Sequence, residues 1–377
     1  MMSNGPIKNN LKSAEFLRAE AELLLEEARK QKAEKNKDVG EPITLPGVPI
    51  DIKIRGDYAW IAENTAVARK INLETGKTVQ IYKGHSGPVT CVALCDKVPG
   101  SGDEKILITG SWDQTIKLWD TDTRKLISST PAHSDFVKVL FVIPSLNLLI
   151  SGSSDKAVRF WDLSSPTSPE KLPALGSISS HTRPVESLDA YIPTSSDSHT
   201  ELSPVLFTAD TMGVIKAWDL KKEGGDRPIW RSTLRDDLAY HRTRINELIY
   251  GHGNLWTDAF PYLLGASGDV IRVYDISSLE EPEFIREVEG HWHDVTHLRV
   301  WLRKRKDGLG KEVWILSASL DGTIRKWKLA ELIVPPKPVA EEKKEIPVAK
   351  PPSSSSNSGW TMTEEEDREL AELMEDD

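Results

Sequence analysis

Residues 84–120 read GHSGPVTCVALCDKVPGSGDEKILITGSWDQTIKLWD, and this stretch carries the pattern from which the architecture follows. It opens with a Gly-His pair, closes with a Trp-Asp pair, and holds short apolar runs separated by polar turn residues. In the last run Ile116 and Leu118 alternate with Lys117 and Trp119, which is the period of a β-strand. The stretch therefore predicts several short antiparallel strands joined by tight turns.

Both halves of this pattern recur further along the chain. A histidine stands four residues before a Val or Ile at five positions, namely His85, His133, His181, His241 and His291. An apolar run, a turn with Asp or Gly and an alternating second run follow each time, and they end at Trp119, Trp161, Trp218, Tyr274 and Trp327. Self-similarity of this kind indicates one supersecondary unit repeated around a common core.

The paired motifs resemble those of the WD-repeat family, whose modules are four-stranded blades of a β-propeller. The match covers about residues 84–329. The resemblance implies a hydrogen-bonded quartet in each module, made of the His, a strand Ser or Thr, a turn Asp and the Trp. Asp and Ser would satisfy both ring nitrogens of a buried histidine. The complete quartets are His85, Thr109, Asp113 and Trp119; His133, Ser151, Asp155 and Trp161; and His291, Ser317, Asp321 and Trp327.

Two repeats depart from the pattern. In one, Met212 takes the place of the turn Asp, and Asp210 stands two positions early. In the other, Tyr274 replaces the Trp, and Gly268 falls at the turn position with Asp269 beside it. The sequence predicts the strands of both repeats but leaves their quartets in doubt.

The region before His85 predicts the remaining parts of the propeller. Residues 46–83 hold four short β-like runs without the His and Trp-Asp marks, and we interpret them as a degenerate first blade. The run EPITL, residues 41–45, is expected to supply the outermost strand of the last blade and so close the ring. The chain is thus expected to be an all-β propeller over residues 41–332, with six blades, and seven as the alternative.

The stretch EGHWHDVTH, residues 289–297, raises the question of a metal site. It places His291, His293 and His297 around Asp294, and such side chains bind zinc well. The repeat gives His291 a structural role, and the other two histidines lie at the start of the next strand or in the loop before it. We therefore expect no metal and no cofactor. The sequence holds no phosphate-binding loop or nucleophile elbow, so it does not predict an enzyme.

Residues 1–40 are expected to form an N-terminal extension with an amphipathic helix. Residues 10–37 contain no Gly or Pro and are rich in Ala, Leu, Glu and Lys, which favours a helix. Two interpretations stay open: the helix packs on its own propeller, or it pairs with another chain in a coiled coil, a layout similar to that of heterotrimeric G-protein β subunits. The apolar side chains follow 3–4 spacing at Ala14, Leu17, Ala21, Leu24 and Ala28.

The C-terminal region divides into two segments. Residues 333–359 hold six prolines and a Ser run, and we expect them to be a disordered linker. The last seventeen residues hold nine acidic side chains and one Arg. We interpret residues 360–377 as an acidic amphipathic helix that docks on a partner, with a solubilising tail as the alternative. The docking side chains would be Trp360, Leu370, Leu373 and Met374.

Charge and cysteine content restrict the class of protein. The net charge of −10 is concentrated in the C-terminal tail, and the near-neutral remainder does not favour nucleic-acid binding. Cys91 and Cys95 share one alternating apolar run, where free cysteine acts as a small apolar residue, and this fits a reducing compartment. The chain shows no signal-peptide pattern and no apolar run of the roughly eighteen residues that a membrane helix needs. We expect a cytoplasmic or nuclear protein without a membrane partner.

These observations predict a non-catalytic scaffold that binds other proteins through the loops of its ring and through its terminal helices. The candidate partner-binding residues are loop residues, mostly of the types enriched in binding hot spots: Trp112, Phe136, Arg183, Arg242, Arg244, Trp292 and His293. Two other functions stay open. WDLK, residues 218–221, suggests a substrate receptor of a cullin-RING ubiquitin ligase, and RKRK, residues 303–306, suggests a nuclear RNA- or ribosome-assembly factor.

Overall fold

The computed structural model describes residues 9–192, 204–212, 214–224, 229–238, 247–250, 262–275, 283–305 and 310–333. The tail expected at residues 360–377 and almost all of the expected linker lie outside the described residues.

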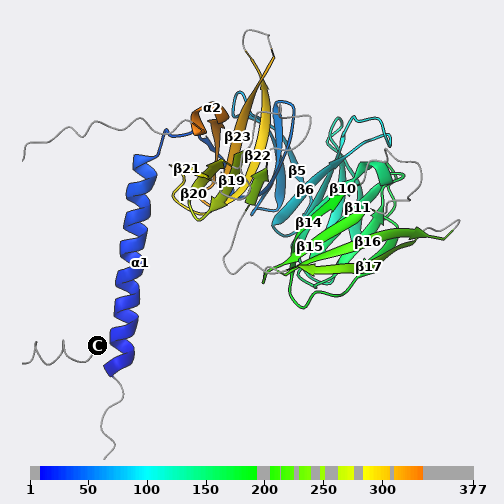
Figure 1. Ribbon diagram of the computed structural model, residues 1–377, viewed down its shortest axis with the longest axis horizontal. Coiled ribbons are helices and arrows are strands. Elements are labelled where there is room, and N and C mark those ends of the chain that lie inside the picture. The colour runs from blue at the N-terminus through cyan, green and yellow to red at the C-terminus, as the bar shows by residue number, and fades with distance from the viewer. Residues whose placement is uncertain are drawn as a thin grey trace, which may run out of the picture. The chain divides into compact units, whose positions relative to one another are not determined.

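Six four-stranded antiparallel sheets follow one another along the chain, so the six predicted blades are confirmed (Figure 1). Blade 1 has β2 (Pro49–Arg55), β3 (Tyr58–Glu63), β4 (Val67–Asn72) and β5 (Thr78–Lys83). Blade 2 has β6 (Val89–Cys95), β7 (Ile106–Ser111), β8 (Thr115–Asp120) and β9 (Leu126–Pro131). Blade 3 has β10 (Val137–Ile143), β11 (Leu148–Ser153), β12 (Val158–Asp162) and β13 (Ala174–Ile178), with the short 3₁₀-helix η1 (Pro144–Leu146) after β10.

The second half of the chain repeats this order. Blade 4 has β14 (Val185–Tyr191), β15 (Val205–Asp210), β16 (Ile215–Glu223) and β17 (Ile229–Leu238). Blade 5 has β18 (Glu247–Tyr250), β19 (Tyr262–Ser267), β20 (Val270–Asp275) and β21 (Glu283–Glu289). Blade 6 has β22 (Val295–Lys304), β23 (Lys311–Ser319) and β24 (Thr323–Lys328), followed by the one-turn helix α2 (Leu329–Leu332).

The apolar core lies between neighbouring blades. Ile108 of β7 and Leu140 of β10 belong to one cluster of buried side chains, and Phe160 of β12 and Leu206 of β15 belong to another. Among the described residues, such clusters join blades 1 and 2, 2 and 3, 3 and 4, 5 and 6, and 6 and 1. The first strands adjoin at these interfaces, with β2 beside β22 and β6, β10 between β6 and β14, and β18 beside β22. At these five interfaces the apolar faces of neighbouring blades pack on one another, so the core is shared between blades.

The N-terminal strand completes the last blade, as the sequence predicted. β1 (Ile43–Thr44) pairs antiparallel with β24, with Ile43 opposite Ile324 and Thr44 opposite Thr323. Ile43 and Leu45 are buried in the cluster between blades 6 and 1. The pairing covers the edge of β24, which would otherwise present unpaired backbone groups.

Blade 1 has a buried ion pair at the end of its second strand. Glu63 is the last residue of β3, the position that Ser111 occupies at the end of β7 in blade 2. Arg69 lies on the neighbouring strand β4. The Arg69 Nε donates a hydrogen bond to Glu63, and its Nη2 donates a second one at 3.2 Å. The hydroxyl of Thr65 donates to the same carboxylate at 3.3 Å. A buried pair with these added hydrogen bonds ties the turn to the sheet in a blade that has no histidine quartet.

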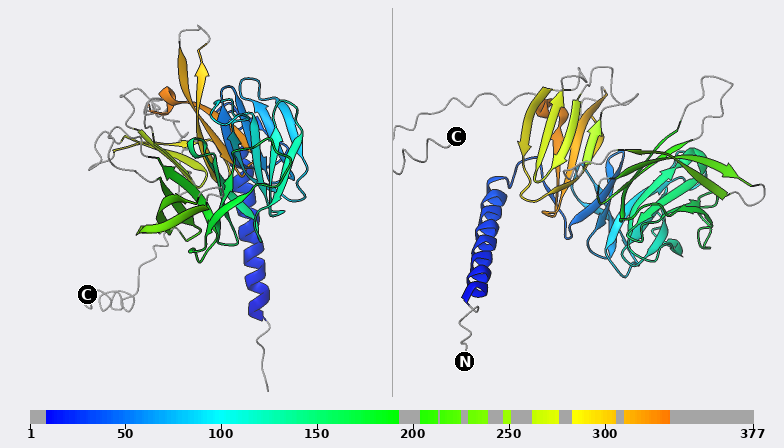
Figure 2. Two further views of the ribbon diagram at one scale, coloured as in Figure 1. Left: turned by 90° about the vertical axis from the view of Figure 1, so that its right-hand side faces the viewer. Right: turned by 60° about the horizontal axis from the view of Figure 1, so that its bottom comes forward.

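The long helix α1 (Asn9–Lys35) meets the propeller at its C-terminal end (Figure 2). Lys32 pairs with Asp269 at 2.6 Å and Lys35 with Glu289 at 3.4 Å. The buried guanidinium of Arg325, on β24, donates hydrogen bonds to the backbone carbonyls of Asn36, at 2.8 Å, and Val39. Arg325 therefore joins the turn that follows α1 to the third strand of blade 6.

The apolar side chains in the middle of α1 remain uncovered. Leu24 is 62% exposed and Leu25 is 53% exposed. Only the last turns of the helix are thus held on the propeller by the contacts described above. No described helix is both long enough and apolar enough to cross a bilayer.

Candidate functional site

In blades 2, 3, 4 and 6 the segment before the first strand and the turn after the second strand meet at the same end of the blade. Trp112 N–H donates to Pro88 O at 3.0 Å and Ser154 N–H donates to Phe136 O at 2.9 Å, and blades 4 and 6 repeat this bond. These bonds fix the two loops against one another in those four blades. We call this end the loop face, and among the described residues it comprises 84–88, 111–114, 133–136, 153–156, 181–184, 210–212, 290–294 and 319–322.

The three complete quartets of the sequence are hydrogen-bonded beneath the loop face. In blade 2, His85 Nδ1 lies 2.8 Å from Asp113, and His85 Nε2 lies 2.7 Å from the Thr109 hydroxyl. Trp119 Nε1–H donates to the same hydroxyl at 2.9 Å. Blades 3 and 6 repeat this geometry with distances between 2.7 and 2.9 Å. Each quartet joins the loop before the blade to its second and third strands.

Blade 4 forms a fourth quartet, which the sequence left in doubt. His181 contacts Asp210 at 3.3 Å and the Thr208 hydroxyl at 2.7 Å, and Trp218 Nε1–H donates to that hydroxyl at 2.9 Å. Asp210 is the last residue of β15 rather than a turn residue. Met212 at the turn position therefore does not prevent the quartet from forming, because the Asp210 carboxylate two residues earlier takes the same role. The signal was present in the sequence, since Asp210 stands where the other blades have Ser111, Ser153 and Ser319.

The pKa shifts of the quartet residues determine which atoms donate and which accept in these hydrogen bonds. Burial lowers the pKa of His133 and of His291, so both imidazoles are neutral near pH 7. Burial alone would raise the pKa of Asp321, but the hydrogen bonds from His291 and Thr323 outweigh it, and the pKa lies below the usual value. A neutral histidine then donates from Nδ1 to the carboxylate and accepts at Nε2 from the hydroxyl. Both ring nitrogens are occupied, so the quartets serve the fold.

The histidines of residues 289–297 have separate partners. His291 belongs to its quartet, His293 Nδ1 accepts the backbone N–H of Asp294 at 2.7 Å, and His297 Nε2 lies 3.7 Å from Asp51 on β2. The part of the chain that the structure describes contains no group of three or more His, Cys, Asp or Glu side chains arranged to hold a metal ion.

The structure brings two of the candidate partner-binding residues into direct contact. Trp112, after β7, and Phe136, before β10, stack across the gap between blades 2 and 3, with ring centroids 4.6 Å apart and planes 13° apart. Trp112 is 45% exposed. Arg183 is exposed on the loop face of the next blade.

Two other candidates lie together in blade 6. The rings of Trp292 and His293 are 6.1 Å apart, in the loop before β22. Arg242 and Arg244 lie outside the described residues, as do the tail side chains Trp360, Leu370, Leu373 and Met374.

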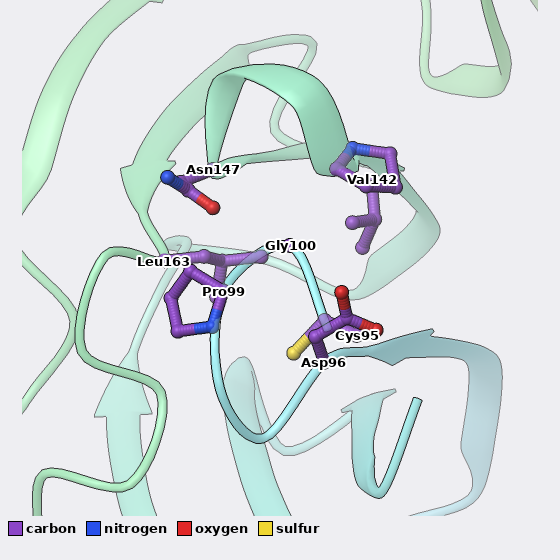
Figure 3. Close-up of a pocket in the computed structure, with 8 residues that line it drawn as sticks. Cys95, Asp96, Pro99, Gly100, Val142, Asn147 and Leu163 are labelled. Carbon is purple, nitrogen blue, oxygen red and sulfur yellow. The ribbon is translucent and has the colours of Figure 1, made fainter. Parts of the chain in front are cut away.

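Two hollows differ in size. Figure 3 shows the first, which lies between the end of β6 and the loop after it, with Cys95 and Pro99, and the turn at η1, with Asn147. Its volume of about 10 Å³ is no more than one water molecule needs, so it is a packing gap between blades 2 and 3. The second is a groove of about 300 Å³ between α1 and the loops of blades 5 and 6, and Trp292 lines it. The sequence did not predict this groove.

Comparisons with known proteins agree with the repeat geometry. The family model "WD domain, G-beta repeat" matches residues 76–120 and 124–162. An uncharacterized WD repeat-containing protein of Schizosaccharomyces pombe is 27% identical over 402 aligned positions, which cover 96% of this chain and 98% of that protein. The six four-stranded blades and the histidine quartets identify the fold of this chain as a propeller of repeated blades. The chain contains WD repeats, and together these findings support a divergent member of the WD-repeat family.

Two further similarities are more limited. The probable E3 ubiquitin ligase complex SCF subunit sconB of Aspergillus niger is 44% identical over 46 residues, which are 12% of this chain and 6% of that protein. Among solved structures, the computationally designed Ika8 protein has 18% sequence identity and a TM-score of 0.46, covering 74% of this chain and 83% of that one.

Proposed function

We propose that the protein is a non-catalytic scaffold that binds other proteins through its loop face. The observation that carries this proposal is the exposed stack of Trp112 on Phe136. Tryptophan is enriched among binding hot spots, and large apolar surfaces left open to water mark interaction sites. We infer that this pair is the anchor for a protein partner, with Arg183 of the neighbouring blade at its margin.

The rigidity of the loops supports the same conclusion. Trp112 immediately precedes Asp113 of one quartet, and Phe136 lies three residues after His133 of another. Both loops are also joined to the rest of their blades by backbone hydrogen bonds. A surface that is ordered before binding loses little conformational entropy when a partner arrives.

Neither of the other functions has comparable support. Trp218 of the WDLK run is buried in the quartet of blade 4, and the similarity to the ligase subunit spans 46 residues. Arg303 of the RKRK run makes a bidentate ion pair with Glu74, at 2.6 and 2.7 Å, and covers the ring of Trp314. An arginine with these contacts is not available for phosphate. We place the scaffold in the cytoplasm or nucleus as part of the proposal.

The first test is affinity purification of the full chain beside three variants, with bound proteins identified by mass spectrometry. We expect Trp112→Ala to lose a specific partner. Tyr191→Ala is the matched control, because it removes an exposed aromatic ring at the far end of β14. A version ending at Leu332 tests the role of the acidic tail. If Trp112→Ala retains every partner that Tyr191→Ala retains, the loop-face proposal is wrong.

A further inference from the structure

Every blade has a basic residue at the same position of its third strand. In blades 2, 3, 4 and 6 this position lies directly opposite the residue that supplies the quartet hydroxyl, and over the six blades it is occupied by Arg69, Lys117, Arg159, Lys216, Arg272 and Arg325. Arg159 differs from the others, because its Nε is buried and its guanidinium forms no hydrogen bond or ion pair with any residue that the structure describes. The other five side chains have partners, which in chain order are Glu63, Ser129, Ser180, Glu287 and the turn that follows α1. A buried N–H without an acceptor costs free energy, so Arg159 does not serve the stability of the free chain.

The sequence of blade 3 explains why Arg159 has no partner. In blade 1 the partner is Glu63, the last residue of the second strand, and blade 3 has Ser153 there. In blade 5 the partner is Glu287, directly opposite on the fourth strand, and blade 3 has Ser177 there. Neither serine carries a charge or forms a hydrogen bond with the guanidinium. Blade 3 itself therefore supplies no acceptor.

Arg325 shows which kind of acceptor fits this position. Arg159 and Arg325 both belong to blades with a complete quartet, and in each blade the charge of the arginine adds to the effect of burial in lowering the pKa of the quartet histidine. Burial lowers the pKa of Arg325, and the ionised Asp321 of its quartet opposes that shift. With a carboxylate already close by, Arg325 donates to neutral backbone carbonyls, whereas blades 1 and 5, which have no described quartet, supply a glutamate. Backbone carbonyls are thus the acceptors that suit an arginine beside a quartet.

The two arginines differ in what covers them. The turn after α1 lies over Arg325, which is 2% exposed, whereas Arg159 is half-buried. In both side chains the Nε has no acceptor among the described residues, so Arg325 binds its carbonyls through Nη1. In blade 3 the chain passes from β12 to β13 through residues 163–173, at the end away from the loop face. No described turn of this chain therefore covers Arg159 as the turn after α1 covers Arg325.

We propose that Arg159 binds the backbone carbonyls of a turn that follows a helix in a partner protein, as Arg325 binds the turn after α1. Arg159 projects on the same side of β12 as Trp161, which packs in the core between blades 2 and 3. Trp112 stacks on Phe136 across the same junction. The inference rests on the proposed scaffold role and adds a second point of contact for its partner.

The neighbours of Arg159 indicate the helix that fits beside it. In blade 5, Asp269 precedes the third strand and pairs with Lys32 of α1, and Gln114 has the same place in blade 2. Glu289 of blade 5 pairs with Lys35, and its counterpart in blade 2 is Pro131. A helix that ends over Arg159 should therefore carry uncharged side chains at these two positions.

The test uses the full chain and a 17-residue peptide with the sequence of residues 24–40, labelled with fluorescein and amidated at its C-terminus. The peptide carries Lys32→Gln and Lys35→Leu, to match Gln114 and Pro131. We expect fluorescence anisotropy to give a dissociation constant below about 1 mM. Arg159→Met should weaken binding by at least about tenfold, because hydrogen bonds from a charged group are lost. Arg124→Met is the matched control, since Arg124 is exposed in the turn after β8, at the other end of blade 2, and should change binding less than about twofold.

Thermal unfolding gives a second measurement. Arg159→Met should leave the melting temperature within about 1 °C of the wild-type value, whereas Arg325→Met should lower it by at least about 3 °C. Equal destabilisation by the two substitutions, or no binding of the peptide to the wild-type chain, would overturn the proposal. Binding that is lost in acetate but retained in chloride of the same concentration would also overturn it, because a carboxylate would then be the ligand. Trp112→Ala should leave peptide binding unchanged, which separates this site from the loop-face proposal.

Discussion

The Asp210 carboxylate performs two tasks that other blades divide between two residues. Its Oδ2 contacts His181, as Asp113 contacts His85, and its Oδ1 accepts the backbone N–H of Met212 at 2.9 Å. In blade 2 that second bond goes to a serine, since Asp113 N–H donates to the Ser111 hydroxyl at 3.1 Å. One buried carboxylate thus orients the histidine and also fixes the turn.

Asp210→Ser should lower the free energy of unfolding by about 1–3 kcal/mol, because a hydrogen bond between a charged group and a buried histidine is lost. The double variant Asp210→Ser with Met212→Asp rebuilds the arrangement of blade 2 and should recover most of the loss. Urea denaturation of the three proteins measures both changes. A double variant no more stable than the single one would show that the quartet of blade 4 depends on more than these two positions.

The spacing in the sequence was enough to predict three quartets, because the His, Ser or Thr, Asp and Trp recur at nearly constant distances. The fourth stayed in doubt because the repeat pattern places the carboxylate in the turn, where this blade has Met212. Thr208 and Asp210 are two residues apart in β15 and project on the same side, so both side chains reach His181. A carboxylate at the end of the strand can therefore replace one in the turn, and motif spacing does not recognise this change.

Two neighbouring elements at the N-terminus have different roles. The strand β1 was predictable, because EPITL alternates and the last blade lacked a fourth strand in the sequence. The docking of α1 was not, since Lys32 and Asp269 are 237 residues apart and no local period connects them. β1 and the residue after it bury Ile43 and Leu45, whereas α1 contributes mainly partly exposed ion pairs.

Two truncated proteins should therefore differ in how much stability they lose. Removing residues 1–35 deletes α1 and should cost only about 1 kcal/mol for each ion pair lost. Removing residues 1–45 also deletes β1, opens the edge of β24 and leaves the buried Arg325 without its carbonyl partners, which should cost about 3–5 kcal/mol. Thermal unfolding and light scattering would compare the two proteins. Equal stability would mean that β1 does not close the ring in solution.

The whole propeller depends on contacts between blades that no single repeat encodes. The number of blades, their order and the closing strand could be predicted, because each follows from a pattern within a few dozen residues. The groove beside α1 and the Trp112–Phe136 stack could not be located, since each joins loops from different parts of the chain. Asp51 on β2 is a further example. It lies in the blade with the fewest recognisable motifs, yet it connects three blades.

The Asp51 carboxylate accepts the backbone N–H of Val92 in blade 2 at 2.9 Å and pairs with Arg299 of blade 6 at 3.3 Å. Burial alone would raise its pKa, but the charges of Lys53, His297 and Arg299 outweigh burial, so the pKa lies below the ordinary value of 3.8. A depressed carboxyl pKa stabilises the fold above the unfolded pKa, and the contribution disappears as pH falls through the folded pKa.

Asp51→Asn should consequently lower the melting temperature at pH 7, and the difference from the wild-type protein should narrow as the pH falls below about 4. Asp189→Asn is the control, because Asp189 is an exposed carboxylate on β14, the first strand of blade 4. Its effect should be small at every pH. A constant difference between wild type and Asp51→Asn from pH 7 to pH 3 would mean that shape and hydrogen bonding, rather than the charge of Asp51, hold blades 1, 2 and 6 together.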